Sequence, residues 1–325
     1  MSEYRTEEPS MKCLAEARMK VISLEARARY ANIMMDTAFK LVFGTEANRD
    51  LLIELLNCLI PGMGIKSVTF KDKEIPGFFV DDKKTVFDLY CTTDKKETFV
   101  VEMQLHGQKY FTDRVLFYST YPLREQVVTP LEEEQIRKKE RKVRKRGTYR
   151  LKPVYMVSIL DFELPHERAD ELREGLVSSY SLRSDCGGAA QMTDALHFVF
   201  LELPRLKVGR DEPEKCRTLL EKIAFAFRHI SFLKERPESF SEEFFAHLFH
   251  AAELANMTSD ERRKYDKEMT TEIDKRAQLS FVREQGRAEG IESTARKMLA
   301  DGLDAATIAK YTGLSCKQIN ALKSM

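Results

Sequence analysis

The sequence KTVFDLYC at residues 84–91, followed by ETFVVEMQL at residues 97–105, decides the fold. Both segments are rich in β-branched and aromatic residues, which is typical of β-strands. The polar residues 93–96 between them predict a tight turn, so the two strands are expected to pair antiparallel. Facing residues in such a pair have a constant sum of residue numbers, and a pairing centred in this turn places Asp88 opposite Glu102.

The same face of this hairpin carries a third polar side chain. Side chains alternate along a strand, so Gln104 is expected on the face that Glu102 occupies. Burying an unpaired carboxylate is costly, and two facing carboxylates repel each other unless a cation lies between them. Oxygen ligands in pairs with open positions suit Mg²⁺ or Mn²⁺, which keep waters for a phosphate substrate. The alternative is a solvated sheet face with ordinary acidic residues.

The segments around the hairpin alternate between helical and strand periodicity. Asp36 or Thr37 is able to cap a short helix that Gly44 ends. The residues KPVYMVSILDF are apolar throughout, as expected for a strand that is covered on both faces. In chain order the elements outside the hairpin are helix, helix and strand before it, and helix, strand and strand after it: 36–44, 46–59, 67–72, 110–126, 152–162 and 197–206.

From residue 211 onward the pattern is helical to the last residues. The predicted helices cover 212–234, 237–256, 258–275, 276–301, 304–310 and 315–323. The expected organisation is a helical arm at 1–31, an α/β domain at 32–210 with a charged insertion at about 127–149, and a helical region at 211–325. Within that last region, residues 304–323 have the outline of a helix-turn-helix, with Ser315 capping the second helix.

Composition excludes several classes of protein. The chain has 325 residues, 43% of them hydrophobic, and a net charge of +1, so a globular protein with a substantial core is expected. The sequence shows neither an apolar run of the roughly 18–20 residues that span a membrane nor the apolar core of a signal peptide. Six cysteines without a CxxC pair argue against a zinc ribbon or a disulfide framework. We therefore expect a cytoplasmic protein with no membrane partner.

The order of these motifs resembles one known family. DTAFKLVFG (36–44), VFDLY (86–90), VVEMQ (100–104), DRVLFYSTYPLREQ (113–126) and LKPVYMVSILDF (151–162) together are similar to the recombination-promoting nuclease (Rpn) family. Its members are transposase-like proteins of the PD-(D/E)xK nuclease superfamily, and the resemblance covers roughly residues 30–300. It implies an α/β protein with a restriction-endonuclease-like αβββαβ core, a mixed central sheet flanked by helices and an all-helical C-terminal region.

The resemblance also implies which residues form the site. Asp88 and Glu102 would be catalytic residues that bind Mg²⁺ or Mn²⁺, helped by the backbone carbonyl of Met103 and by Asp36. The metal would lower the pKa of a bound water and neutralise charge in the transition state. Gln104 occupies the position of the superfamily lysine, as is usual in this branch. A glutamine orients water through hydrogen bonds but brings no positive charge.

Three further features are candidates for binding DNA. Arg114 and Tyr118, one helical turn apart, are typical of an edge that contacts phosphates, and Lys40 is a weaker candidate. The alternative reading of Arg114 and Tyr118 is a surface charge and a core aromatic. The basic run RKKERKVRKR (137–146) indicates either a nucleic-acid contact or a solvated charged loop. The helical pair 304–323 indicates either DNA reading or docking on a partner.

These observations lead to a functional prediction with two rivals. The leading prediction is a metal-dependent DNA endonuclease that hydrolyses phosphodiester bonds and is linked to recombination or mobile elements. A homodimer is one option, because one site per chain would need two copies to cut both strands. The first rival is a catalytically weak protein that binds DNA or associates with itself. The second is a defence or toxin-like nuclease that is inactive until triggered.

Overall fold

The computed structural model describes residues 28–71, 74–75, 85–137, 151–165, 175–185 and 190–323, and for 74–75, 85–86 and 128–137 only the backbone. The chain divides into two compact units, and the division falls between Glu268 and Met269, inside the long helix α7 (Ser259–Ala300). Among the residues that the structure describes, no helix is long and apolar enough to cross a membrane.

A mixed sheet of six strands forms the centre of the first unit. Its order is β1-β4-β5-β6-β8-β7, in which β5, β6 and β8 run parallel and the other neighbours pair antiparallel. The strands are β1 Val68–Phe70, β4 Leu89–Thr93, β5 Thr98–Gln104, β6 Val154–Leu160, β7 Val177–Ser181 and β8 Leu196–Glu202, and a separate two-stranded sheet pairs β2 Glu74–Ile75 with β3 Thr85–Val86. This mixed α/β architecture confirms the predicted fold class.

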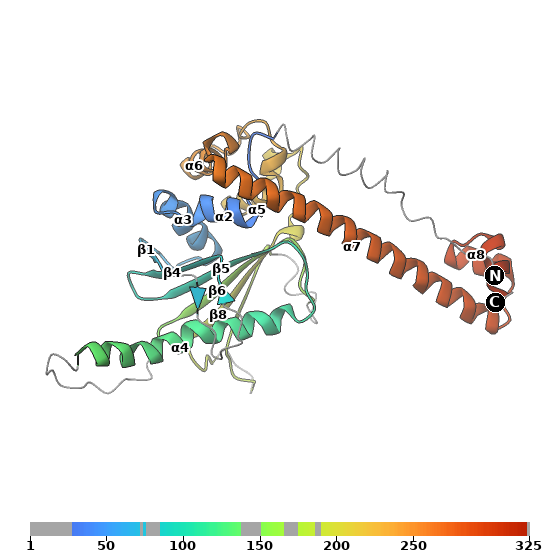
Figure 1. Cartoon of the computed structure of the whole chain (residues 1–325), viewed down its shortest axis with the longest axis horizontal. Coiled ribbons are helices and arrows are strands. Elements are labelled where there is room, and N and C mark those ends of the chain that lie inside the picture. The colour runs from blue at the N-terminus through green and yellow to red at the C-terminus, as the bar shows by residue number, and fades with distance from the viewer. Residues whose placement is uncertain are drawn as a thin grey trace. The chain divides into compact units, whose positions relative to one another are not determined.

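Helices cover both faces of the sheet, as Figure 1 shows. One face packs against α2 (Asp36–Phe43), α3 (Arg49–Leu59), α5 (Leu219–His229) and α6 (Glu243–Ala251), and the other against α4 (Phe111–Arg137). Alternate residues of β5 enter the two cores: Phe99 and Val101 face α2, whereas Val100 faces α4. Every residue of β6 is buried, which confirms the prediction of a strand covered on both faces.

The start of α2 differs from the predicted cap. Met35 is the N-cap residue and Asp36 lies in the first turn, without a side-chain hydrogen bond to a backbone N–H at the cap. Instead, the Glu268 carboxylate on α7 accepts a hydrogen bond from the Thr37 N–H at 3.0 Å. Gly44 ends the helix as predicted, and a Cβ at this glycine would lie 2.6 Å from the Leu89 side chain. The absence of that Cβ lets α2 lie close against β4.

Several elements begin or end at other residues than predicted. Residues 28–31 of the predicted helical arm are not helical, since Arg29 lies in a bend and Tyr30 is bridged to Glu253, and residues 1–27 lie outside the described part. α4 continues to Arg137, so the first part of the predicted insertion at 127–149 is helix, and most of the basic run at 137–146 lies outside the described residues. The sequence analysis does not predict the edge strand β7.

The helices of this region differ in length from those predicted: α5 and α6 are shorter, and α7 is longer. α5 begins at Leu219, where Thr218 and Glu221 form a capping box, and not near residue 212. α7 is one helix of 42 residues where two were expected, because the charged sequence around residue 276 contains no helix breaker. The remaining short 3₁₀ helices are η1 Glu46–Asn48, η3 Leu203–Arg205, η4 Pro213–Lys215, η5 Ile230–Phe232 and η6 Leu254–Asn256.

The second unit ends in a pair of short helices, α8 (Ala305–Thr312) and α9 (Cys316–Lys323). Ile308 and Ile319 from the two helices are buried together with Ala295 of α7. The side chain of Ser315 accepts a hydrogen bond from the Gln318 N–H at 3.3 Å, which confirms the predicted cap of the second helix.

Candidate active site

The two predicted carboxylates meet at the junction of β4 and β5. The observed register pairs Leu89 with Val101, and one step further it sets Asp88 opposite Glu102, as predicted. Asp88 lies in the bend before β4, where its carboxylate accepts a hydrogen bond from the Met103 N–H at 2.9 Å. The Asp88 N–H donates in turn to the Glu102 carboxylate, with a longer separation of 3.4 Å. The pair is therefore held by the backbone of both strands.

Burial makes this pair electrostatically unfavourable. Loss of solvent and, after it, repulsion from Asp88 together raise the pKa of Glu102 to about 8. The pKa of Asp88 is raised to about 6, mainly by loss of solvent and also by the negative charge of Asp36, against the opposing hydrogen bond from Met103. A cation at this position would favour the ionised form of both carboxylates.

Helix α2 brings a carboxylate, Asp36, and an ammonium group, Lys40, close to Asp88. Lys40 Nζ lies 2.5 Å from Asp36 Oδ1 and 3.9 Å from Asp88 Oδ1. Asp36 and Lys40 are one turn apart on the helix, so the close approach of α2 to β4 at Gly44 brings both toward Asp88. Lys40, predicted as a DNA contact, thus lies between two carboxylates.

The fourth predicted group, Gln104, is held by Arg114. The Arg114 guanidinium donates to Gln104 Oε1 at 2.8 Å and to Gln108 Oε1 at 2.6 Å. Because the carbonyl oxygen of Gln104 is engaged, its amide NH₂ is the part that remains to bond a further group. The Arg114 guanidinium lies 5.8 Å from the centre of the Tyr118 ring, and that ring packs edge-on against Phe87. Arg114 and Tyr118 therefore support Gln104 from α4.

The donor set was compared with the needs of a divalent cation. Within the described ranges, no group of three or more His, Cys, Asp or Glu residues is arranged to hold a metal ion. The chemistry of the donors nevertheless suits a hard cation, since Asp88, Glu102 and the nearby Asp36 offer oxygen only. Met103 reaches the site through its N–H, and its carbonyl remains a predicted ligand.

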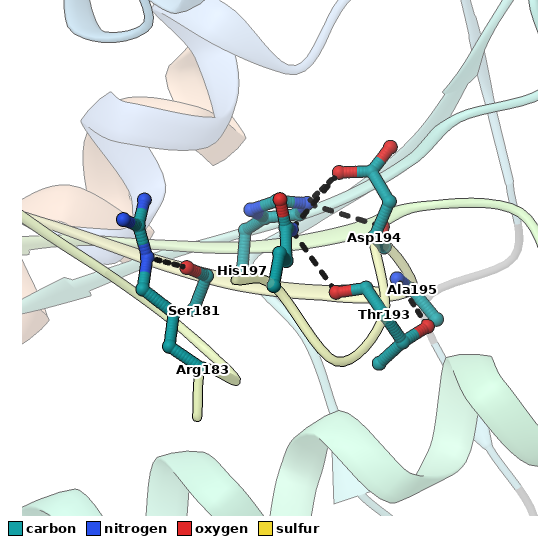
Figure 2. Close-up of polar contacts among 7 residues, drawn as sticks. Ser181, Arg183, Thr193, Asp194, Ala195 and His197 are labelled. Atoms are coloured by element: carbon teal, nitrogen blue, oxygen red, sulfur yellow. Dashed lines mark hydrogen bonds and ion pairs between the residues drawn. The ribbon is translucent and has the colours of Figure 1, made fainter. Parts of the chain in front are cut away.

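Two histidines lie in other acidic surroundings. His197, at the start of β8, bonds Asp194 Oδ1 at 3.0 Å, as Figure 2 shows, and its ring stacks on Tyr155. This is the opposite end of the sheet from Gln104, so His197 organises the turn before β8. His247 bonds Asp50 at 2.9 Å, an acidic partner from α3 that spacing along the sequence does not reveal.

Sequence reasoning also missed part of the site. It did not identify Gln108 as a partner of Arg114, or Glu268 as the acceptor at the start of α2. Both contacts depend on tertiary packing or loop conformation. The one local signal was the spacing of Asp36 and Lys40 in DTAFK, which places an acid and a base one helical turn apart.

A half-buried acidic pair on a mixed sheet, with helices on both faces, defines a restriction-endonuclease-like α/β protein of the nuclease class. The family described as "PD-(D/E)XK nuclease family transposase" matches residues 33–281, and the chain belongs to this family. Residues 294–324 match a second description, "Rpn/YhgA-like nuclease family, C-terminal HTH domain", which confirms the predicted helix-turn-helix. Comparison with curated proteins and with solved structures gives no match.

Proposed function

We propose that this protein is a metal-dependent endonuclease that hydrolyses phosphodiester bonds in DNA. The observation that supports it best is the half-buried pair of Asp88 and Glu102, which face each other with raised pKa values. Such a pair is unfavourable in a purely structural role and is suited to a divalent cation. The family match and the helix-turn-helix agree with DNA as the substrate.

In this proposal Asp88 and Glu102 hold Mg²⁺ or Mn²⁺, with Asp36 and the Met103 carbonyl as further ligands. The metal, when bound, supplies a water of lowered pKa and neutralises charge on the phosphate. The hydrogen bond from Met103 fixes the Asp88 carboxylate, so this ligand is already oriented before the metal binds. The protein thus contributes geometry as well as charge.

Lys40 and Gln104 together take the role of the single lysine found in other members of the superfamily: one supplies positive charge and the other supplies hydrogen bonds. Lys40, close to Asp88, brings the positive charge that Gln104 lacks. Gln104, with its carbonyl held by Arg114, presents amide N–H groups that would donate to an oxygen of the scissile phosphate. Arg114 is a positioning residue, because it acts through Gln104.

The remaining parts of the chain are assigned on the same basis. We assign residues 32–210 to the nuclease domain and 211–325 to the helical region that ends in the helix-turn-helix, which would bring DNA to the site. A cytoplasmic location, a link to recombination or mobile elements and a homodimer that cuts both strands belong to the same proposal.

A plasmid-nicking assay tests the function. We expect nicking with Mg²⁺ or Mn²⁺, none with EDTA, and none for Asp88→Asn or Glu102→Gln. Asp94→Asn is the matched control, since Asp94 is an exposed carboxylate in the turn of the same hairpin. Equal nicking with EDTA, or by both variants, would rule out the proposal.

The replacement of the superfamily lysine by Gln104 favours a second candidate, a DNA-binding protein that cleaves weakly or not at all. Its helix-turn-helix would then carry the function. This candidate predicts duplex binding that persists in EDTA, together with no cleavage and no divalent-metal binding by the wild-type protein. Metal binding that is lost in Asp88→Asn would decide against it.

A further inference from the structure

An exposed aromatic surface lies at the start of α4, beside the site. Tyr110 is 65% exposed, Phe117 is 56% exposed and Leu116 is 52% exposed. Tyr110, Arg114 and Phe117 are spaced by four and three residues, so they share one side of the helix. Together with Lys109 we call these three residues the α4 entry surface. Large apolar side chains gathered in solvent are typical of binding sites.

Tyr110 has an unusual backbone. Its φ angle is 63°, in the left-handed region that aromatic residues seldom adopt. Its carbonyl accepts a hydrogen bond from the Arg114 N–H at 3.0 Å, so the strained residue is fixed at the entry to the helix. Burial of the ring does not offset this strain, because the ring remains in solvent next to the Lys109 ammonium, 4.9 Å from the ring centre. Strain of this kind concentrates at ligand-binding positions.

Contacts connect the α4 entry surface to Gln104, two residues after Glu102 on β5. Arg114 donates to Gln104 on β5 and stands over the ring of Tyr118. The Tyr118 ring lies 6.3 Å from that of Phe117, and Phe117 meets Tyr121 edge-on at 5.6 Å. A ligand that reaches Gln104 therefore lies next to these rings.

The alternation of rings and cations indicates the class of ligand. Unpaired bases stack on aromatic rings while the neighbouring phosphates pair with lysine or arginine. In a paired duplex the bases stack on one another, so exposed rings offer it little. A partner helix would require a continuous apolar stripe, but the exposed Asp113 and Thr120 lie between Leu116 and Phe117 around the helix.

From these contacts we infer that the α4 entry surface binds an unpaired DNA strand beside the cleavage site. Tyr110 and Phe117 stack on bases and Lys109 pairs with a phosphate, while Arg114 remains bonded to Gln104. The Asp113 carboxylate repels phosphate, so the strand follows the Lys109 side of the surface. This role rests on the proposed nuclease function and adds a substrate class to it: DNA that is single-stranded or locally opened at the cut.

The test is a binding measurement on the full chain in EDTA. The probes are a thymidine oligonucleotide with one 2-aminopurine and a hairpin duplex with the same label. We expect the double variant Tyr110→Ala, Phe117→Ala to bind the single strand roughly 10-fold or more weakly and to lose the change in 2-aminopurine fluorescence. Duplex binding should be unchanged, as should all values for Phe232→Ala, whose ring is 63% exposed elsewhere.

The conservative double variant Tyr110→Phe, Phe117→Tyr keeps both rings and should restore strand binding, which separates stacking from misfolding. Unchanged strand binding in the alanine variant would overturn the inference in favour of a protein partner at this surface. An equal loss for strand and duplex would overturn it too. Since no cleavage is needed, repeating the measurement in Glu102→Gln separates this outcome from a failure of the proposed function.

Discussion

Two glutamates on the same sheet, Glu202 and the half-buried Glu102, differ in whether other residues satisfy their charge. Glu202 on β8 is fully buried, and its carboxylate accepts hydrogen bonds from the Leu164 N–H at 2.8 Å and the Ser178 hydroxyl at 3.0 Å, with Arg205 at 3.1 Å. Glu102 on β5 accepts only a long hydrogen bond, from Asp88 N–H, among those observed in the described residues, and its pKa is raised. Glu202 therefore has protein groups that satisfy its charge, whereas Glu102 requires a bound cation to do so.

The largest expected effect concerns Glu202. Removing it leaves the Arg205 guanidinium, 7% exposed, without its carboxylate partner. Loss of one member of a buried ion pair costs about 3–5 kcal/mol, so Glu202→Ala should lower the free energy of unfolding by that amount. Thermal unfolding without metal, compared with Glu102→Ala, measures the difference. A similar loss for both variants would erase the contrast between the two glutamates.

The second prediction concerns the cation near the site. Lys40→Met should reduce cleavage by about 10²–10³-fold, the range for loss of one group that stabilises transition-state charge. The double variant Lys40→Met, Gln104→Lys should recover part of this activity, since it returns a positive charge to the strand. Lys66→Met, at an exposed lysine, is the control. Full activity of Lys40→Met would show that its ion pairs are structural.

The third prediction concerns Gln104. Gln104→Ala should slow cleavage by roughly 10–100-fold, as for loss of a positioned orienting group, and Gln104→Lys should retain or raise activity. Arg114→Ala should resemble Gln104→Ala, and adding it to Gln104→Ala should have little further effect on the rate of cleavage. Additive losses would mean that Arg114 acts on the substrate directly. Single-turnover rates at saturating metal provide the measurement.

The smallest effect is the dependence of stability on pH. A carboxyl group with a raised pKa binds its proton more tightly in the folded protein, so its contribution is complete below pH about 4 and is lost as pH rises. The loss should pass through about pH 6 for Asp88 and about pH 8 for Glu102. Without metal, Tm should fall by a few degrees between pH 5 and pH 8.5. Glu102→Gln should reduce that fall, and Mg²⁺ should oppose it; a fall of the same size in Glu102→Gln would contradict the assignment.

The local part of this architecture could be predicted from the sequence. The period and the short turn of the hairpin place Asp88 opposite Glu102, and the apolar run at β6 indicates a strand covered on both faces. The contacts between distant residues could not. The Glu202 carboxylate accepts hydrogen bonds from Leu164 and Ser178, which lie 38 and 24 residues away in the sequence, and Asp50 reaches His247 across 197 residues. No pattern within one element records such contacts.

Other errors also have physical causes. The edge strand β7, VSSYS, has few apolar residues because one of its sides has no neighbouring strand in the sheet. The helix α4 was predicted to end at residue 126, yet Pro122 lies buried within it and the helix continues past Pro130. Tertiary packing thus overrides a local signal for a break.

The register of β5 has one more consequence. β4 pairs with this strand from Thr98 to Val101 on one side, and β6 pairs with it from Thr98 to Gln104 on the other. A slip by one residue would turn Glu102 and Gln104 to the opposite face, so no intermediate register provides a partly formed site. Mutations in this protein should therefore fall into two kinds. Changes at the site alter the turnover of each molecule, whereas changes in the core alter only how many folded molecules a cell contains.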